Sequence, residues 1–221
     1  MLANGKMKAR GDTLIEVLFA VAVFSLVAVG GLSIMNQGSA TSERALEITL
    51  VRQEIDSQAE TLRFLNASYN AAYQQGTTIN DYPANTPAGQ WAIMAKSIKD
   101  LHNLQVSDFG LTATSTCPTA PRPNGSFIMN THIAKFDSSL NKLKPANTST
   151  DHVYAYVKYE ADNQVSLAEG IWIEAISSVS ADINQANADY IDFHIRACWD
   201  GPGQSLPVTI GTIVRLYEPR G

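Results

Sequence analysis

The chain has 221 residues, enough for one sizeable globular domain together with a membrane anchor. Hydrophobic residues make up 45% of it and charged residues 17%, a balance typical of folded proteins that excludes wholesale disorder. The net charge is −5, and without the three bases of residues 1–11 the remaining 13 basic and 21 acidic residues give −8. Because non-specific nucleic-acid binding needs a basic face, we expect no nucleic-acid partner.

Residues 1–11 contain three bases and no acid, and they end at Gly11. By the positive-inside rule this segment is a cytoplasmic leader. An apolar run follows from Leu14 to Met35, and Glu16 is its only charge. The 18 residues from 17 to 34 would span about 27 Å as a helix, close to the thickness of the hydrocarbon core. The sequence therefore predicts a membrane-spanning segment, with a carboxylate near its start that costs roughly 2–4 kcal/mol in hydrocarbon.

Three interpretations of this segment stay open on the residues alone. It could be a signal peptide, since Gly38-Ser39-Ala40 offers a small-x-small cleavage site. It could be a plain single-span anchor. It could also be a processed segment that anchors the chain first and packs against other helices later. The length of the run and the position of Glu16 argue against the signal peptide.

The residues after the apolar run favour continuation of the helix. Between 39 and 66 there is no Pro or Gly, and apolar residues recur every three or four positions, as on one face of an amphipathic helix. This stripe consists of Ile48, Val51, Ile55, Ala59, Leu62 and Leu65. Charged residues, among them Glu47 and Glu54, occupy the remaining faces. We expect one helix over residues 12–66, about 80 Å long, followed by a globular domain over 67–221.

Turn-forming residues dominate the stretch from 66 to 125, and one short helix is expected within it. Thr86 followed by Pro87 is typical of a capped first turn. The apolar face of this helix would be formed by Trp91, Met94, Ile98 and Leu101. The most economical interpretation of these four residues is a helix that packs on a core.

From residue 125 onward, apolar and polar residues alternate, which predicts strands. The expected strands are 127–129, 153–160, 170–176, 190–199 and 207–217. The fourth alternates best, with Ile191 and Phe193 on one side and Asp192 and His194 on the other. Because polar turns connect the strands, we expect an antiparallel sheet with one open face, the other being covered by the amphipathic half of the long helix. The predicted fold class is α+β.

Sequence patterns of enzymes and metal sites are absent. The chain has no G-x-S-x-G, P-loop or H-E-x-x-H motif, and its four histidines lack metal-ligand spacing. The oxygen-rich stretch 182–189 lacks the glycine and the terminal glutamate of an EF-hand calcium loop. We therefore expect neither enzymatic activity nor a bound metal or cofactor.

Cys117 and Cys198 allow one intramolecular disulfide. In an extracytoplasmic domain they would be oxidised, whereas in the cytoplasm they would be free thiols. A bridge would close a loop of about 80 residues and stabilise the fold by ~4–5 kcal/mol in the chain-entropy model. Both alternatives stay open on the cysteines alone.

The amino-terminal segment resembles the class III signal of type IV pilins and pseudopilins. The shared features are a basic leader that ends in glycine, the motif Asp-Thr-Leu-Ile-Glu-Val and about twenty apolar residues. The resemblance implies that a prepilin peptidase cuts after Gly11 and methylates the new amino terminus at Asp12. The rest of the motif is matched by Thr13, Leu14, Ile15 and Glu16. The chain departs from the family at Asp12, where phenylalanine is usual, and in the absence of a helix-kinking proline from the apolar run.

The resemblance also implies a pilin-like fold and a structural role, as a minor pilin or pseudopilin rather than the major subunit. Glu16 would pair with the α-amine of Asp12 in a neighbouring subunit. The implied partners are the peptidase, other pilin subunits and the inner or cytoplasmic membrane, from which the chain passes into an extracellular or periplasmic filament. A surface ligand of the globular domain stays open. The alternative is a binding or adhesin domain held by an ordinary signal anchor or released after Ala40.

Overall fold

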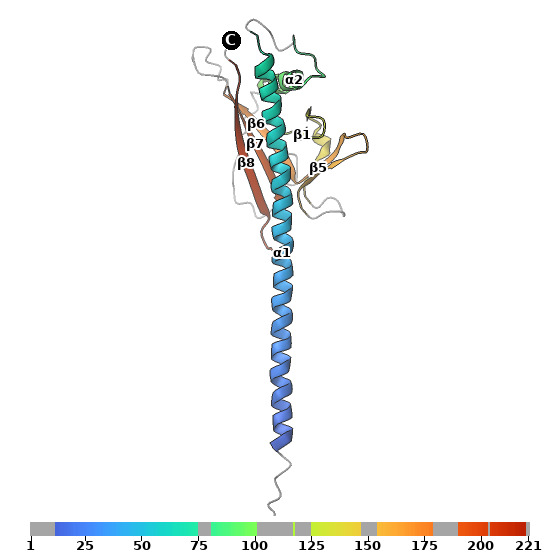
Figure 1. Cartoon of the computed structure of the whole chain (residues 1–221), viewed down its shortest axis with the longest axis vertical. Coiled ribbons are helices and arrows are strands. Elements are labelled where there is room, and N and C mark those ends of the chain that lie inside the picture. The colour runs from blue at the N-terminus through green and yellow to red at the C-terminus, as the bar shows by residue number, and fades with distance from the viewer. Residues whose placement is uncertain are drawn as a thin grey trace, which may run out of the picture. The chain divides into compact units, whose positions relative to one another are not determined.

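The computed structural model describes residues 12–74, 81–100, 117, 125–146, 154–178, 190–202 and 204–219. The chain divides into two compact units, Met1–Ala45 and Leu46–Gly221. The described part of the first unit is helical throughout, whereas the second unit combines helices with strands. Figure 1 colours the elements from α1 in blue to β8 in red. The predicted α+β class is confirmed.

Helix α1 spans Asp12–Ala72, and its 61 residues include Gly30, Gly31 and Gly38 without interruption. The prediction of one long helix is therefore confirmed, and the helix continues past the expected end at residue 66. Tyr69, in the added turns, is buried in the core of the second unit. At the same level the side-chain Nδ2 of Asn66 donates to the backbone oxygen of Tyr217 over 3.1 Å. These contacts hold the last two turns of α1 against the domain.

The predicted apolar stripe of α1 forms one wall of the core. Val51, Leu62 and Leu65 are fully buried, and Ile55 and Ala59 are nearly so. Glu47 lies outside this stripe, yet it is buried as well, because the indole Nε1 of Trp199 donates to its Oε2 over 3.1 Å. A buried carboxylate needs such a donor, since an unpartnered one costs several kcal/mol. A buried hydrogen bond therefore joins α1 to the core in addition to apolar packing.

Helix α2 spans Pro87–Asp100 and confirms the predicted short helix. Its cap is the expected one: the Thr86 hydroxyl accepts a hydrogen bond from the Gly89 backbone N–H over 3.1 Å. Trp91 and Met94 are fully buried on its inner face. The ring of Trp91 packs edge-on against Phe193, with centroids 5.8 Å apart. Leu101, also expected on this face, lies outside the described residues.

The main sheet consists of β6 (Ile171–Ser177), β7 (Tyr190–Trp199) and β8 (Val208–Tyr217) in the order β6-β7-β8, and both pairs are antiparallel. The three strands predicted last in the chain are thus confirmed, and β7 has the predicted bounds. The predicted alternation also holds, because Ile191, Phe193 and Ile195 are fully buried while the residues between them are half-buried. One face of the sheet therefore packs on the core, and the other carries the polar side chains.

Five short strands form two further sheets, so the expectation of one antiparallel sheet is wrong. Strands β1 (Ile128–Asn130) and β2 (Lys135–Asp137) pair antiparallel. In the other sheet β5 (Val165–Glu169) lies between β4 (Tyr156–Tyr159) and β3 (Leu143–Lys144), which follows the 3-10 turn Leu140–Lys142. The β3–β5 pair is parallel.

Gly170 explains why β5 and β6 belong to different sheets although they are nearly continuous in sequence. Its φ of +67° is a left-handed conformation that favours glycine, and it turns the chain between Glu169 and Ile171. Its N–H donates to the carbonyl of Lys144, whereas its own carbonyl accepts from the N–H of Cys198 in the main sheet, both over 2.8 Å. A side chain here would meet the carbonyl oxygen of Cys198 at 2.8 Å. One glycine thus joins the two sheets.

Candidate functional site: the amino-terminal segment of α1

The residues of the predicted cleavage motif fall at the start of α1. Gly11 lies outside the described residues, and Asp12 and Thr13 are described as helical backbone only. Leu14, Ile15 and Glu16 follow on the helix with exposed side chains. The structure thus places four residues in succession after Asp12 on a regular helix, and the cut after Gly11 and methylation stay predictions.

The apolar run forms a helix surface that is exposed on all sides within its own unit. Fourteen large apolar side chains from Leu14 to Met35 are between 43% and 74% exposed. Burying one such side chain is worth about 1.5–3 kcal/mol, so exposing fourteen to water costs on the order of 20–40 kcal/mol. The segment is long and apolar enough to cross a membrane. Lipid or other apolar helices around this segment would remove its apolar side chains from water.

The polar groups of this segment do not disturb the helix. Ser25, inside the apolar run, donates its hydroxyl proton to the carbonyl of Val21 one turn earlier, over 2.8 Å. A side chain at Gly30 or Gly31 would meet no atom within 4 Å, so nothing in the described unit requires glycine there. Small residues at these positions allow another helix to approach closely, which keeps the predicted packing role open.

Glu16 is the single charged side chain between Leu14 and Met35. It is exposed, and no described residue forms an ion pair or a hydrogen bond with it. A carboxylate surrounded by apolar side chains and hydrocarbon is strongly disfavoured unless a cation or a donor compensates it. The pairing with the amine of Asp12 in a neighbouring subunit supplies such a cation, and it stays a prediction.

Cys117 and Cys198 form a disulfide, the oxidised of the two alternatives, with Cα atoms 5.6 Å apart and a sequence separation of 81. Cys198 lies on β7 and is almost fully buried. A disulfide persists in oxidising compartments, so it agrees with an extracytoplasmic location for this unit. The bridge joins the start of the strand-rich region to the main sheet.

Among the residues that the structure describes, no three His, Cys, Asp or Glu side chains gather as metal ligands would. The oxygen-rich stretch 182–189 lies outside them. The sequence interpretation missed a different group of polar residues, namely Glu47 and Gln58 on α1, which are buried and bond to distant parts of the domain. The partner of Glu47 is 152 residues away and that of Gln58 is 71 residues away, so no local pattern could have indicated these contacts.

Comparisons of the chain with known protein families, with curated proteins and with solved structures find no match.

Proposed function

We propose that this chain is a structural subunit of a type IV filament system, a minor pilin or pseudopilin. A prepilin peptidase cleaves it after Gly11, and it polymerises through the amino-terminal part of α1. The observation that carries the proposal is a continuous helix with fourteen exposed apolar side chains and a single carboxylate, Glu16, directly after a basic leader ending in glycine. A plain anchor has the same apolar surface but has no use for that carboxylate.

The assembly step follows from the position of the charge. Cleavage after Gly11 creates an α-amine at Asp12, four residues before Glu16. When a subunit leaves the membrane for the helix bundle, its Glu16 pairs with the amine of a neighbour. An unpaired carboxylate in that apolar bundle would cost several kcal/mol, so the pair fixes the axial register of each added subunit. Methylation of the amine keeps its positive charge.

The preference for a minor subunit rests on the domain and on residue 12. The described residues of the second unit form three sheets and a long-range disulfide, so this domain is large and irregular. Asp12 replaces the phenylalanine that is usual at the first mature position. The presence of Glu16 argues against the tip-initiating subunit, which in this family tends to lack it. Before assembly the chain would be a single-pass protein with its second unit outside the cytoplasm.

The amino-terminal residue of the protein recovered from cells tests the proposal. Intact-mass analysis should give a chain that begins at Asp12, with an additional methyl group if methylation follows. Gly11→Leu should leave the leader attached, because it removes the glycine after which the peptidase cuts in the family that the segment resembles. A chain beginning at Thr41 would indicate a secreted domain, and one beginning at Met1 a plain anchor; either result contradicts the proposal.

A further inference from the structure

The second unit contains a small polar hollow, lined by residues of β1, β2, the 3-10 turn and the turn that joins β4 to β5. It has a volume of about 280 Å³, and seven of its eight lining residues are polar or charged. Small-molecule pockets are lined mostly by apolar side chains. A ligand that suits this polar hollow is therefore itself polar over most of its surface.

Asn130, one of the lining residues, fixes the two turns beside the polar hollow. Its side chain is buried, and both ends of its amide are bonded. Nδ2 donates to the backbone oxygen of Asn163 in the β4–β5 turn over 2.7 Å, and Oδ1 accepts from the N–H of His132 in the β1–β2 turn over 3.1 Å. The hollow is thus formed before a ligand enters, which lowers the entropic cost of binding.

The charges that line the polar hollow leave one cation without a counter-charge. The carboxylate of Asp137 accepts from the N–H of Ser139 over 2.9 Å and from Nζ of Lys142 over 2.8 Å, so it is already neutralised. Lys135 is exposed, and no described residue forms an ion pair or a hydrogen bond with its ammonium group. A carboxylate on a ligand would supply the missing charge, because charge-assisted hydrogen bonds are about twice as strong as neutral ones.

The remaining polar groups of the hollow favour hydroxyls on the same ligand. The Ser138 hydroxyl and the Gln164 side-chain amide line it, and no described residue bonds to either group. Both groups donate and accept hydrogen bonds, whereas a sulfate ion only accepts and would leave the amide oxygen without a donor. Sugar hydroxyls can do both. The volume equals that of about nine water molecules, more than a sulfate ion fills and enough for one sugar ring.

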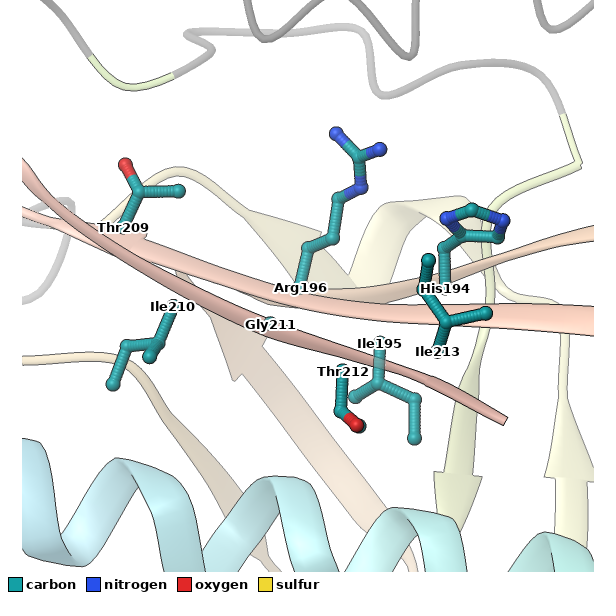
Figure 2. Close-up of a pocket in the computed structure, with 8 residues that line it drawn as sticks. All are labelled: His194, Ile195, Arg196, Thr209, Ile210, Gly211, Thr212 and Ile213. Atoms are coloured by element: carbon teal, nitrogen blue, oxygen red, sulfur yellow. The ribbon is translucent and has the colours of Figure 1, made fainter.

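A larger hollow beside Gly211 on the main sheet lacks such a free cation. Its volume is about 600 Å³, and Figure 2 shows Arg196 and Thr209 standing on the same side of the strands around it. Nε of Arg196 lies 3.9 Å from Oε2 of the buried Glu174, and the Thr209 hydroxyl donates to Sγ of Cys198 over 3.8 Å. Because its arginine is already paired, this larger hollow gives no comparable reason to bind an acid.

We propose that the polar hollow binds a single sugar unit that carries a carboxylate, with the acid at Lys135 and the sugar hydroxyls at Ser138 and Gln164. The cation selects the acidic group, and the two groups that both donate and accept select the hydroxyls. All eight lining residues are described and belong to the second unit. The inference therefore does not depend on the proposed role of the amino-terminal helix.

Three small probes test the proposal on the full chain in micelles of lauryldimethylamine oxide, whose headgroup is not a sugar. Saturation-transfer NMR at low salt measures glucuronate and glucose directly, and sulfate by its displacement of glucuronate. We expect glucuronate to bind at least fivefold more tightly than either of the others. Equal affinity for glucose would overturn the acidic preference, and equal affinity for sulfate would overturn the sugar assignment. No saturable binding of glucuronate at tens of millimolar would overturn the site.

Two lysine variants locate the binding on the protein. Lys135→Gln removes the unpaired cation and should weaken glucuronate binding at least threefold, while glucose binding stays within twofold. The matched control is Lys96→Gln, which removes an exposed lysine of α2 outside the hollow and should leave both affinities within twofold. Both side chains are exposed, so neither change should disturb folding, and far-UV circular dichroism checks this. Equal glucuronate binding by the two variants contradicts the proposal.

Discussion

The side chain of Gln58 on α1 forms the hydrogen bonds with β1 that a neighbouring strand would otherwise form. Replacing Gln58 should therefore destabilise the domain strongly. Its side chain is fully buried. The amide Oε1 accepts from the backbone N–H of Met129 over 2.9 Å, and Nε2 donates to the backbone oxygen of Met129 over 3.1 Å. Two residues earlier, Phe127 makes the same pair of bonds with Ile173 of β6. The Gln58 amide therefore continues the ladder of β1 at a position where no described strand pairs with Met129 on this side.

Gln58→Leu keeps the approximate volume of the side chain but removes both bonds to Met129, together with the bond that Nε2 donates to Oε1 of Glu54 over 2.9 Å. The N–H and C=O of Met129 are then left buried without partners, and each such group costs about 1–3 kcal/mol. We expect a loss of about 2–6 kcal/mol in the free energy of unfolding of the domain. Because domain stabilities are themselves about 5–15 kcal/mol, this loss is large enough to measure without ambiguity.

Guanidinium unfolding of the full chain in detergent, followed by tryptophan fluorescence, measures this loss. All three tryptophans lie in the second unit, so their emission reports on the domain rather than on the membrane segment. Gln53→Leu is the matched control, since Gln53 is exposed on the same helix and should change stability by less than about 0.5 kcal/mol. If the two variants differed by less than 1 kcal/mol, the assignment of Gln58 as a partner of the β1 backbone would be wrong.

Two further predictions concern the disulfide and the partly buried carboxylate of Glu54. Replacing Cys117 and Cys198 by Ser should destabilise the domain by ~4–5 kcal/mol, because the bridge closes a loop of about 80 residues in the unfolded chain. The same guanidinium unfolding assay measures this loss, and an unchanged unfolding midpoint would contradict the prediction. Burial raises the pKa of Glu54 above its ordinary value of 4.5, and the hydrogen bond from Gln58 opposes this only in part. The unfolded chain therefore loses this proton first, and the stability contributed by Glu54 falls as the pH rises from 4.5 through the folded pKa. Glu54→Gln should abolish that fall while the exposed control Glu60→Gln retains it, and identical stability–pH curves for the two variants would refute the assignment.

Much of the helical and sheet structure could be predicted because its residues repeat with a clear period. The stripe from Val51 to Leu65 has the spacing of a helix face, and β7 alternates from Tyr190 to Ala197. Thr86 and Pro87 define the start of α2 by local chemistry alone. These features depend on neighbours in sequence, so a single sequence contains them.

The features that could not be predicted depend on contacts between distant residues. Strands β2 and β3 have three and two residues, too few for alternation to be recognised. Glu47 and Gln58 are polar residues on a helix, and only the positions of Trp199 and Met129 explain their burial. The same limit applies to the place of β8 beside β7, because the alternation of a strand does not indicate which of its sides is paired.

The candidate site divides in the same manner. The apolar run could be recognised directly as a segment able to span a membrane, because a span is linear in sequence. The cleavage motif from Asp12 to Glu16 stays a prediction. The disulfide between Cys117 and Cys198 could not be decided, since only the fold shows that these two residues, 81 positions apart, are close together.

The most direct test of the account is the fraction of the chain that co-sediments with sheared filaments when Glu16 loses its charge. Glu16→Gln keeps the shape of the side chain, so the chain should still insert into the membrane. Its share in the filament fraction should fall at least tenfold, because the amine of the neighbouring subunit has no counter-charge. The control Glu43→Gln changes an exposed glutamate beyond the apolar run and should assemble as the wild type does. A Glu16→Gln chain that enters filaments at the wild-type level would contradict assembly through this carboxylate.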